Sequence, residues 1–490
     1  MTGLFTDTAF FSDICEEIRL FIDTRRIEKL EQDKPFAQGL SVLHHLAEKD
    51  GTISSGAEVF LDGNPVSAYE YVCPDEEGEL GKKRAAKRAA KISVYRALSK
   101  LFKVSMPWGS LTGIRPTKLL RDSEARQAEQ SARALFVGEF NVSPDKYAFA
   151  KGIVDIQKPL MPRDDEIDIY IGIPFCTTRC AYCSFASNTP GVFKGAEENY
   201  VKALLFELSA AEELLCGYRV RSVYVGGGTP TALSEESLKA VLTRAGEIAA
   251  CGDEFTVEAG RPDTITEEKL RIIKQSGAGR VSVNTQTLSD ATLARIGRRH
   301  TAQDFYRAYS MAKEAGFSVN TDVIAGLPGE SEKDLCSTLE GMIELYPENI
   351  TVHTLAVKRA SKFAEDNMDA LPGDSQAAGM ISLSQDLLES AGYRAYYMYR
   401  QKYMRGSLEN AGYSKPGFEC LYNIDNMEEL CGVLAFGAGA ISKRVFKKGE
   451  RIERSANIKD LRLYIDKAEE MIQRKRILLG IQPLSEPKKC

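Results

Sequence analysis

Several features are scarce in this chain of 490 residues, and each scarcity excludes a class of protein. Only four histidines are present, so acid–base chemistry built on several histidines has few candidates. No apolar run is long enough to span a bilayer, and acids interrupt the apolar N-terminal segment, so we expect neither a membrane protein nor a signal peptide. With 64 Lys and Arg against 69 Asp and Glu, the chain has no global attraction to nucleic acid or anionic lipid.

The cysteines are more numerous, but they do not form a disulfide pattern. Their number is odd, 11, and they lack the dense, regular spacing of a secreted disulfide scaffold. Thiols persist in a reducing compartment, so a cytoplasmic location is expected.

Apolar, β-branched runs alternate with amphipathic stretches from about residue 166 onward. The expected strands are residues 167–173, 222–225, 254–258, 280–284, 318–324 and 349–354. Strands that alternate with helices predict a parallel sheet covered by helices, and six such units are too few for a closed barrel. We therefore predict an α/β fold with a partial (βα)6 TIM-like barrel over residues 166–360.

The flanking regions have different patterns. A small α+β domain is expected over 1–160, with a helix at 13–32, a hairpin turning at Asp62-Gly63 and a basic helix over 82–91. A solvated face explains this basic helix better than a nucleic-acid contact does.

The loop from Trp108 to Lys118, which includes Arg115, is either a tight structural loop or a ligand contact. An α+β C-terminal region that covers the substrate is expected over 361–490. It should hold a helix at 376–391, a strand at 393–399, a loop-rich stretch to 424, a glycine-rich apolar segment at 433–442 and a helix within 459–479.

The most informative motif is the spacing of Cys176, Cys180 and Cys183 in a single short run. Soft thiolates favour iron–sulfur clusters, and a four-iron cluster with three protein ligands keeps one iron open. An open iron can bind S-adenosylmethionine (SAM) and pass it an electron. A zinc site with a remote fourth ligand, or three buried thiols, is the less favoured alternative.

Further motifs follow the predicted strands in turn. Gly226-Gly-Gly-Thr-Pro230 ends the second strand, where bare backbone suits the ammonium group of SAM. Glu258 ends the third and suits an ammonium or a ribose hydroxyl, unless it is a surface acid. Arg298 could pair with the SAM carboxylate or could lie on a helix surface. Asp322 needs a hydrogen-bond partner, either a ribose hydroxyl or a backbone group. For His353 a core role is favoured over a ligand role.

Together, Ile173-Pro-Phe-Cys, Gly-Gly-Gly-Thr-Pro, Val-Asn-Thr-Gln and Asp-Val-Ile-Ala-Gly-Leu-Pro-Gly resemble the oxygen-independent coproporphyrinogen III oxidase family of radical SAM enzymes. The run 107–118 and the stretch 397–423 are similar to its HemZ-type coproporphyrinogen dehydrogenase branch. The resemblance implies a radical SAM barrel, a 4Fe-4S cluster on the three cysteines and SAM as cofactor. It implies SAM contacts by Tyr170, Tyr182, Gly227, Gly228, Thr229, Glu258, Gln286, Arg298, Asp322 and Ala356.

Three departures from the family pattern bear on the activity. The usual Tyr-x-His before the cysteine run is Tyr170-Ile-Gly172, and the fourth cysteine of the decarboxylating oxidase is Phe185. A haem-chaperone branch carries His-Asn-x-x-Tyr-Trp in its C-terminal part, but this chain has Cys420-Leu-Tyr-Asn423 and no histidine after His353.

The leading hypothesis is anaerobic oxidative decarboxylation of coproporphyrinogen III to protoporphyrinogen IX by a 5′-deoxyadenosyl radical. A haem-trafficking protein without this activity is the main alternative, and a radical SAM enzyme touching RNA is a third. The tetrapyrrole propionates need cations, for which Lys358, Arg359, Arg400, Lys402 and Arg405 are candidates. A low-potential flavodoxin or ferredoxin would supply electrons, and the sequence does not indicate an oligomeric state.

Overall fold

The computed structural model describes residues 1–22, 24, 26–113, 115–126, 129–184, 187–356, 372–401, 408–446 and 451–481. The chain divides into two compact units, residues 1–151 with 406–408, and residues 152–405 with 409–490. The domain boundaries expected from the sequence, 1–160, 166–360 and 361–490, stay a prediction. Four of the five candidate cations for the propionates, Lys358, Arg359, Lys402 and Arg405, lie outside the described residues.

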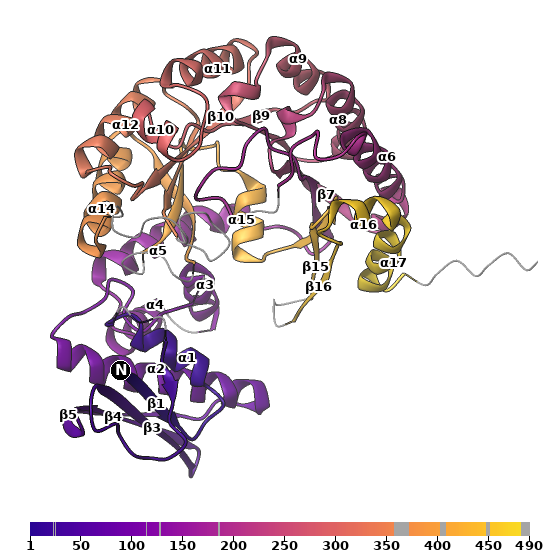
Figure 1. Cartoon of the computed structure of the whole chain (residues 1–490). Helices are drawn as coiled ribbons and strands as arrows, with labels where there is room; N and C mark the ends of the chain where they lie inside the picture. The colour runs from indigo at the N-terminus through magenta and orange to yellow at the C-terminus, as the bar shows by residue number, and fades with distance from the viewer. Residues whose placement is uncertain are drawn as a thin grey trace, which may run out of the picture. The chain divides into compact units, whose positions relative to one another are not determined.

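The first unit is built on a five-stranded sheet in the order β2-β1-β3-β4-β5 (Figure 1). Its strands are β1 (Thr2–Thr6), β2 (Glu28–Lys29), β3 (Leu40–Lys49), β4 (Thr52–Leu61) and β5 (Asn64–Pro74). The hairpin between β4 and β5 is confirmed, with φ of 51° at Asp62 and 77° at Gly63. The prediction of a helix over 13–32 is wrong in length, because α1 (Phe11–Ile18) ends earlier. Phe21 and Ile22 follow in a turn and pack on the core from there.

The long helix α2 (Gly78–Phe102) contains the predicted basic segment. Its alanines, such as Ala85 and Ala89, are buried, while its basic side chains pair with acids of the same unit. One example is Lys87, whose ammonium lies 2.6 Å from the Asp13 carboxylate. These ion pairs favour the interpretation of a solvated, structurally paired face.

The loop that begins at Trp108 is a tight structural loop. Trp108 is only 1% exposed, so its ring offers no free face to a ligand, contrary to the ligand interpretation of this loop. The Ser110 amide donates to the Phe140 carbonyl at 2.8 Å, and a Cβ on Gly109 would lie 1.9 Å from that same oxygen. The unit continues with α3 (Pro116–Arg126), α4 (Glu129–Arg133) and a π-helix (Ala134–Glu139), and α5 (Pro144–Gln157) runs from the first unit into the second.

The second unit holds an 11-stranded sheet whose middle is the predicted parallel (βα)6 array. The strands β6 (Glu166–Ile173), β7 (Arg219–Gly227), β8 (Glu254–Gly260), β9 (Arg280–Val283), β10 (Ser318–Ala325) and β11 (Asn349–Thr354) lie side by side in chain order. The connecting helices include α6 (Ala196–Ser209), α7 (Ala211–Leu214), α8 (Glu235–Ala249), α9 (Glu267–Gln275), α10 (Asp290–Arg295), α11 (Ala302–Glu314) and α12 (Glu332–Glu344). They form the outer arc in Figure 1, as the strand–helix alternation predicts.

Strand β6 shows how the sheet separates two cores. Ile167, Ile169 and Ile171 pack with the outer helices, while Tyr170 lies on the opposite, inner side. The alternation follows from the two-residue period of a strand. The inner positions are polar or aromatic, and they point to the side where a site can be built.

The C-terminal region extends the same sheet at both edges. Antiparallel β12 (Arg394–Tyr399) and β13 (Asn410–Ser414) follow β11, whereas β14 (Gly432–Phe436), β15 (Ile441–Val445) and β16 (Ile452–Ala456) follow β6. The expected helices are α14 (Asp374–Ser390), α16 (Leu461–Asp466) and α17 (Ala468–Leu479).

The stretch predicted as loop-rich up to 424 instead contains β13 and the first half of α15 (Leu421–Glu428). Helix α15 lies within the curve of the sheet, where the Tyr422 ring stacks on Tyr224 at 4.4 Å between centroids (Figure 1). None of the described helices is long and apolar enough to cross a membrane.

Candidate active site

The structure places the predicted site residues along one rim. Each lies on, or shortly after, the carboxyl-terminal part of one of the strands β6 to β11. The set is Tyr170, Cys176, Cys180, Tyr182, Cys183, Gly227, Gly228, Thr229, Glu258, Gln286, Arg298, Asp322 and Ala356. Because the carboxyl ends of parallel strands meet on one side of a barrel, these residues share one face.

The cysteine loop is fixed by backbone hydrogen bonds at both ends. The Cys176 amide donates to the Asn188 carbonyl at 2.9 Å, and the Ala181 amide donates to the Ile296 carbonyl at 3.0 Å. None of the three cysteines forms a disulfide within the described residues, and Cys180 is buried while the other two are half-buried. Burial raises the pKa of the Cys176 thiol, although the Thr229 hydroxyl at 3.4 Å counteracts it. A fixed loop with three cysteines outside any disulfide is suited to hold a thiolate-bound cluster.

The triple glycine is required by close packing. A Cβ on Gly226 would lie 2.6 Å from the Glu258 carboxylate, and one on Gly228 would lie 2.4 Å from the Phe175 carbonyl. Gly227 has φ of +105°, a conformation that favours glycine. The backbone of this turn is therefore bare toward the rim, as a close ligand contact requires.

Glu258 is a half-buried acid that accepts hydrogen bonds from two neutral donors. It accepts from the Tyr224 hydroxyl at 2.6 Å and from the Gly227 amide at 3.2 Å. Burial nevertheless raises its pKa to about 7. A bound ammonium group would restore its charge, which fits the expected contact with the amino group of SAM.

Arg298 and Asn284 carry buried polar atoms that lack partners. The Arg298 guanidinium donates to the Asn284 carbonyl and interacts with Tyr182 and Cys180. Within the described part of the chain, Arg298 Nε and Asn284 Oδ1 have no hydrogen-bond partner. Native structures rarely leave such groups unsatisfied, so both are consistent with a polar ligand at this rim.

Gln286 and Asp322 are linked through the backbone of β10. Gln286 has φ of +79°, unusual for a residue other than glycine, and its amide donates to the Asp322 carbonyl at 3.0 Å. Strained backbone of this kind is common at functional sites. Burial would raise the pKa of Asp322, but hydrogen bonds from His353 and Asn320 outweigh it and keep that pKa low.

His353 is not the satisfied core histidine favoured by the sequence. Its side chain is 28% exposed, with Nε2 3.6 Å from Asp322 Oδ2 and Nδ1 3.3 Å from the Tyr399 hydroxyl. Tyr224 and Arg261 were not predicted as site residues. The inward position of Tyr224 on β7 could have indicated it, because its neighbours Val223 and Val225 belong to the outer core.

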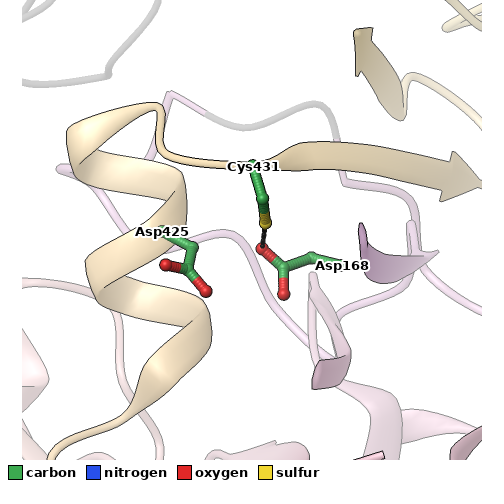
Figure 2. Close-up of side chains that lie close together, drawn as sticks. All are labelled: Asp168, Asp425 and Cys431. Carbon is green, nitrogen blue, oxygen red and sulfur yellow. Dashed lines mark hydrogen bonds between the residues drawn. The ribbon is translucent and has the colours of Figure 1, made fainter. Parts of the chain in front are cut away.

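A second polar cluster lies deeper in the barrel, on the amino-terminal side of Tyr170. Figure 2 shows Asp168, Asp425 and Cys431, whose ligand atoms lie within 4.8 Å of one another. The Cys431 thiol donates to Asp168 at 2.9 Å, and the Arg221 guanidinium donates to Asp425 at 2.6 Å. Burial raises the pKa of both carboxyls, and the charge of Asp168 raises the pKa of Asp425 further.

Comparisons with known proteins identify the family. The model of the radical SAM superfamily matches residues 170–341. The chain is 35% identical over 445 residues to the oxygen-independent coproporphyrinogen-III oxidase-like protein HemZ of Bacillus subtilis, with 88% of each protein covered. The chain belongs to this radical SAM family.

The chain is also similar to two further proteins. The haem chaperone HemW of Escherichia coli is 31% identical over 288 residues, which covers 58% of this chain and 71% of HemW. The solved structure of coproporphyrinogen III oxidase, HemN, from Escherichia coli matches with a TM-score of 0.53 at 21% identity, over 67% of this chain and 78% of HemN. The radical SAM fold is thereby confirmed, and with it a 4Fe-4S cluster and SAM as cofactors.

Proposed function

We propose that this protein is the anaerobic enzyme that converts coproporphyrinogen III to protoporphyrinogen IX. The observation that carries the proposal is the extent of the similarity to the oxidase-like HemZ. That alignment covers 88% of the chain, whereas the alignment to the chaperone HemW covers 58%. We also propose a cytoplasmic location and a low-potential flavodoxin or ferredoxin as electron donor.

The proposed reaction assigns distinct tasks to the residues of the rim. Cys176, Cys180 and Cys183 would hold the cluster, which with SAM supplies a carbon radical able to take a hydrogen atom from a propionate side chain. Loss of carbon dioxide, with transfer of one further electron to an external electron acceptor, then leaves a vinyl group, once on each of two propionates.

The remaining residues bind and orient. Glu258 would hold the SAM ammonium, Arg298 its carboxylate, and Asp322 a ribose hydroxyl, with His353 and Tyr399 fixing the Asp322 carboxylate. No side chain needs to act as nucleophile or base.

An anaerobic assay tests the proposal. The reconstituted protein, given coproporphyrinogen III, SAM and a reductant, should form protoporphyrinogen IX and release two molecules of carbon dioxide per substrate. The Cys176→Ala, Cys180→Ala, Cys183→Ala triple variant is the control and should form none. SAM cleavage without any decarboxylation would contradict the proposed substrate.

The similarity to HemW favours a second candidate, a haem-trafficking protein. Against it stands the sequence at 420–423, which lacks the histidine of the chaperone motif. Titration with haem, followed in the visible range, separates the two functions. Stable stoichiometric haem binding without turnover would support the carrier.

A further inference from the structure

Arg261 lies at the rim without a role in the SAM contacts described above. It directly follows β8, and it is only 3% exposed. Its guanidinium contacts the cysteine loop, since Nη1 lies 3.4 Å from the Thr178 carbonyl and 3.6 Å from Cys180 Sγ. Both distances are compatible with hydrogen bonds donated by the same nitrogen, Nη1.

Asp263 fixes the orientation of this guanidinium. Arg261 Nε donates to Asp263 Oδ1 at 3.0 Å, and Nη2 donates to Oδ2 at 3.2 Å. This two-point contact uses the planar fork that lysine lacks. The Thr177 hydroxyl also donates to Asp263 at 3.4 Å, so the same carboxylate holds both the arginine and the cysteine loop.

The three cysteines differ in their surroundings. Cys176 has the neutral Thr229 hydroxyl as its neighbour, at 3.4 Å. Cys180, the most buried of the three, has the Arg261 guanidinium within hydrogen-bond distance. The Arg298 guanidinium also reaches Cys180, but it is already assigned to SAM. Arg261 therefore provides a buried positive charge that is directed at one cluster ligand.

We propose that Arg261 is a positioning residue that raises the reduction potential of the cluster through its contact with Cys180. Hydrogen bonds to the ligand sulfurs are among the factors that set the potential of an iron–sulfur cluster. A guanidinium beside a buried thiolate stabilises negative charge, and the reduced cluster carries one more electron than the oxidised cluster. This proposal rests on the cofactors of the family and is independent of the tetrapyrrole substrate.

The test compares Arg261→Gln with the unmodified full-length protein in a redox titration of the reconstituted cluster, followed by electron paramagnetic resonance without SAM. The midpoint potential of the variant should become more negative. The expected fall in the ratio of reduced to oxidised cluster at a fixed potential is about tenfold, which corresponds to about 59 mV for one electron. An unchanged potential at equal iron content would overturn the proposal.

Two further variants separate this effect from a general loss of structure. Arg271→Gln removes an exposed arginine on α9 that pairs with Glu268, and its potential should equal that of the unmodified protein. Arg261→Lys keeps the charge but loses the fork, so its potential should shift in the same direction by less. If Arg261→Gln fails to assemble a cluster, Arg261→Lys becomes the deciding variant. An unchanged midpoint potential in Arg261→Lys would then refute the proposed role of Arg261. A purely structural role would lower the iron content and leave the potential of the remaining clusters unaltered.

Discussion

At the scale of single residues, we expect Cys176, Cys180 and Cys183 to determine whether the cluster is bound. Each is one of only three expected protein ligands, so Cys→Ala at any of them should abolish the broad iron–sulfur absorbance and SAM cleavage. Cys336→Ala, on the outer helix α12, is the matched control and should do neither. Iron analysis and visible spectra of the reconstituted proteins check this. A triple variant that still binds about four irons per chain would refute the ligand assignment.

Arg298 and Asp322 are expected to bind SAM without holding the cluster. Arg298→Ala and Asp322→Ala should each weaken SAM binding by roughly 1–3 kcal/mol, the free energy of a lost charged hydrogen bond. Calorimetric titration of the reconstituted variants with SAM measures this loss, and their iron content should be normal. The control is Arg271→Ala, which removes an exposed arginine on α9. Unchanged affinity in both rim variants would mean that the SAM pocket lies elsewhere.

At the scale of elements, the parallel strands were predictable and the inner helix was not. The runs that become β6 to β11 are apolar and end in chemical motifs, so local sequence indicates both the strands and the rim. Helix α15 has a short sequence with acids at Asp425 and Glu428, both fully buried. Its position depends on contacts with remote residues, such as Arg221 with Asp425, and no local pattern indicates these.

The contacts of α15 predict an unusual pH dependence of stability. Burial raises the pKa of Asp168 and of Asp425 above that of an unfolded aspartate, near 4, so the folded pair holds a proton that the unfolded chain has released. The pair therefore stabilises the fold least at high pH. The contribution of the pair to the free energy of unfolding falls as the pH rises from about 4 through neutrality. The decrease is up to about 1.4 kcal/mol per pH unit for one proton.

Comparison of the unmodified protein with Asp425→Asn tests this. The amide can still accept from Arg221 but has no carboxyl proton to lose, so the variant should show a smaller decline in the free energy of unfolding between pH 5.5 and 8. Glu166, Glu254, Arg221 and Cys431 face the same cluster and remain in both proteins, so the difference between the two isolates the pair. Denaturant unfolding followed by circular dichroism gives these free energies. Equal slopes in the two proteins would contradict a raised pKa of Asp425 in the folded state.

At the scale of the whole molecule, the expected functional residues are distributed unequally between the two units. All cysteine ligands and all predicted SAM contacts belong to the second unit, which also has its own core. A chain that started at Glu166, the expected beginning of the barrel, would lose two contacts of this unit. Gln157 donates to the Tyr396 carbonyl at 2.9 Å, and Arg221 donates to the Leu160 carbonyl. Both contacts lie within the second unit, which begins at Gly152.

A chain that begins at Gly152 should therefore keep its cluster and cleave SAM. We expect it to lose most of its turnover of coproporphyrinogen, because a large anionic substrate and a reactive radical need a cover that excludes water. Anaerobic assays of both chains should compare protoporphyrinogen formed with 5′-deoxyadenosine released, since uncoupled cleavage raises only the latter. If the shorter chain decarboxylates its substrate at the full-length rate, residues 1–151 do not cover the site, and docking of a partner becomes the better explanation for them.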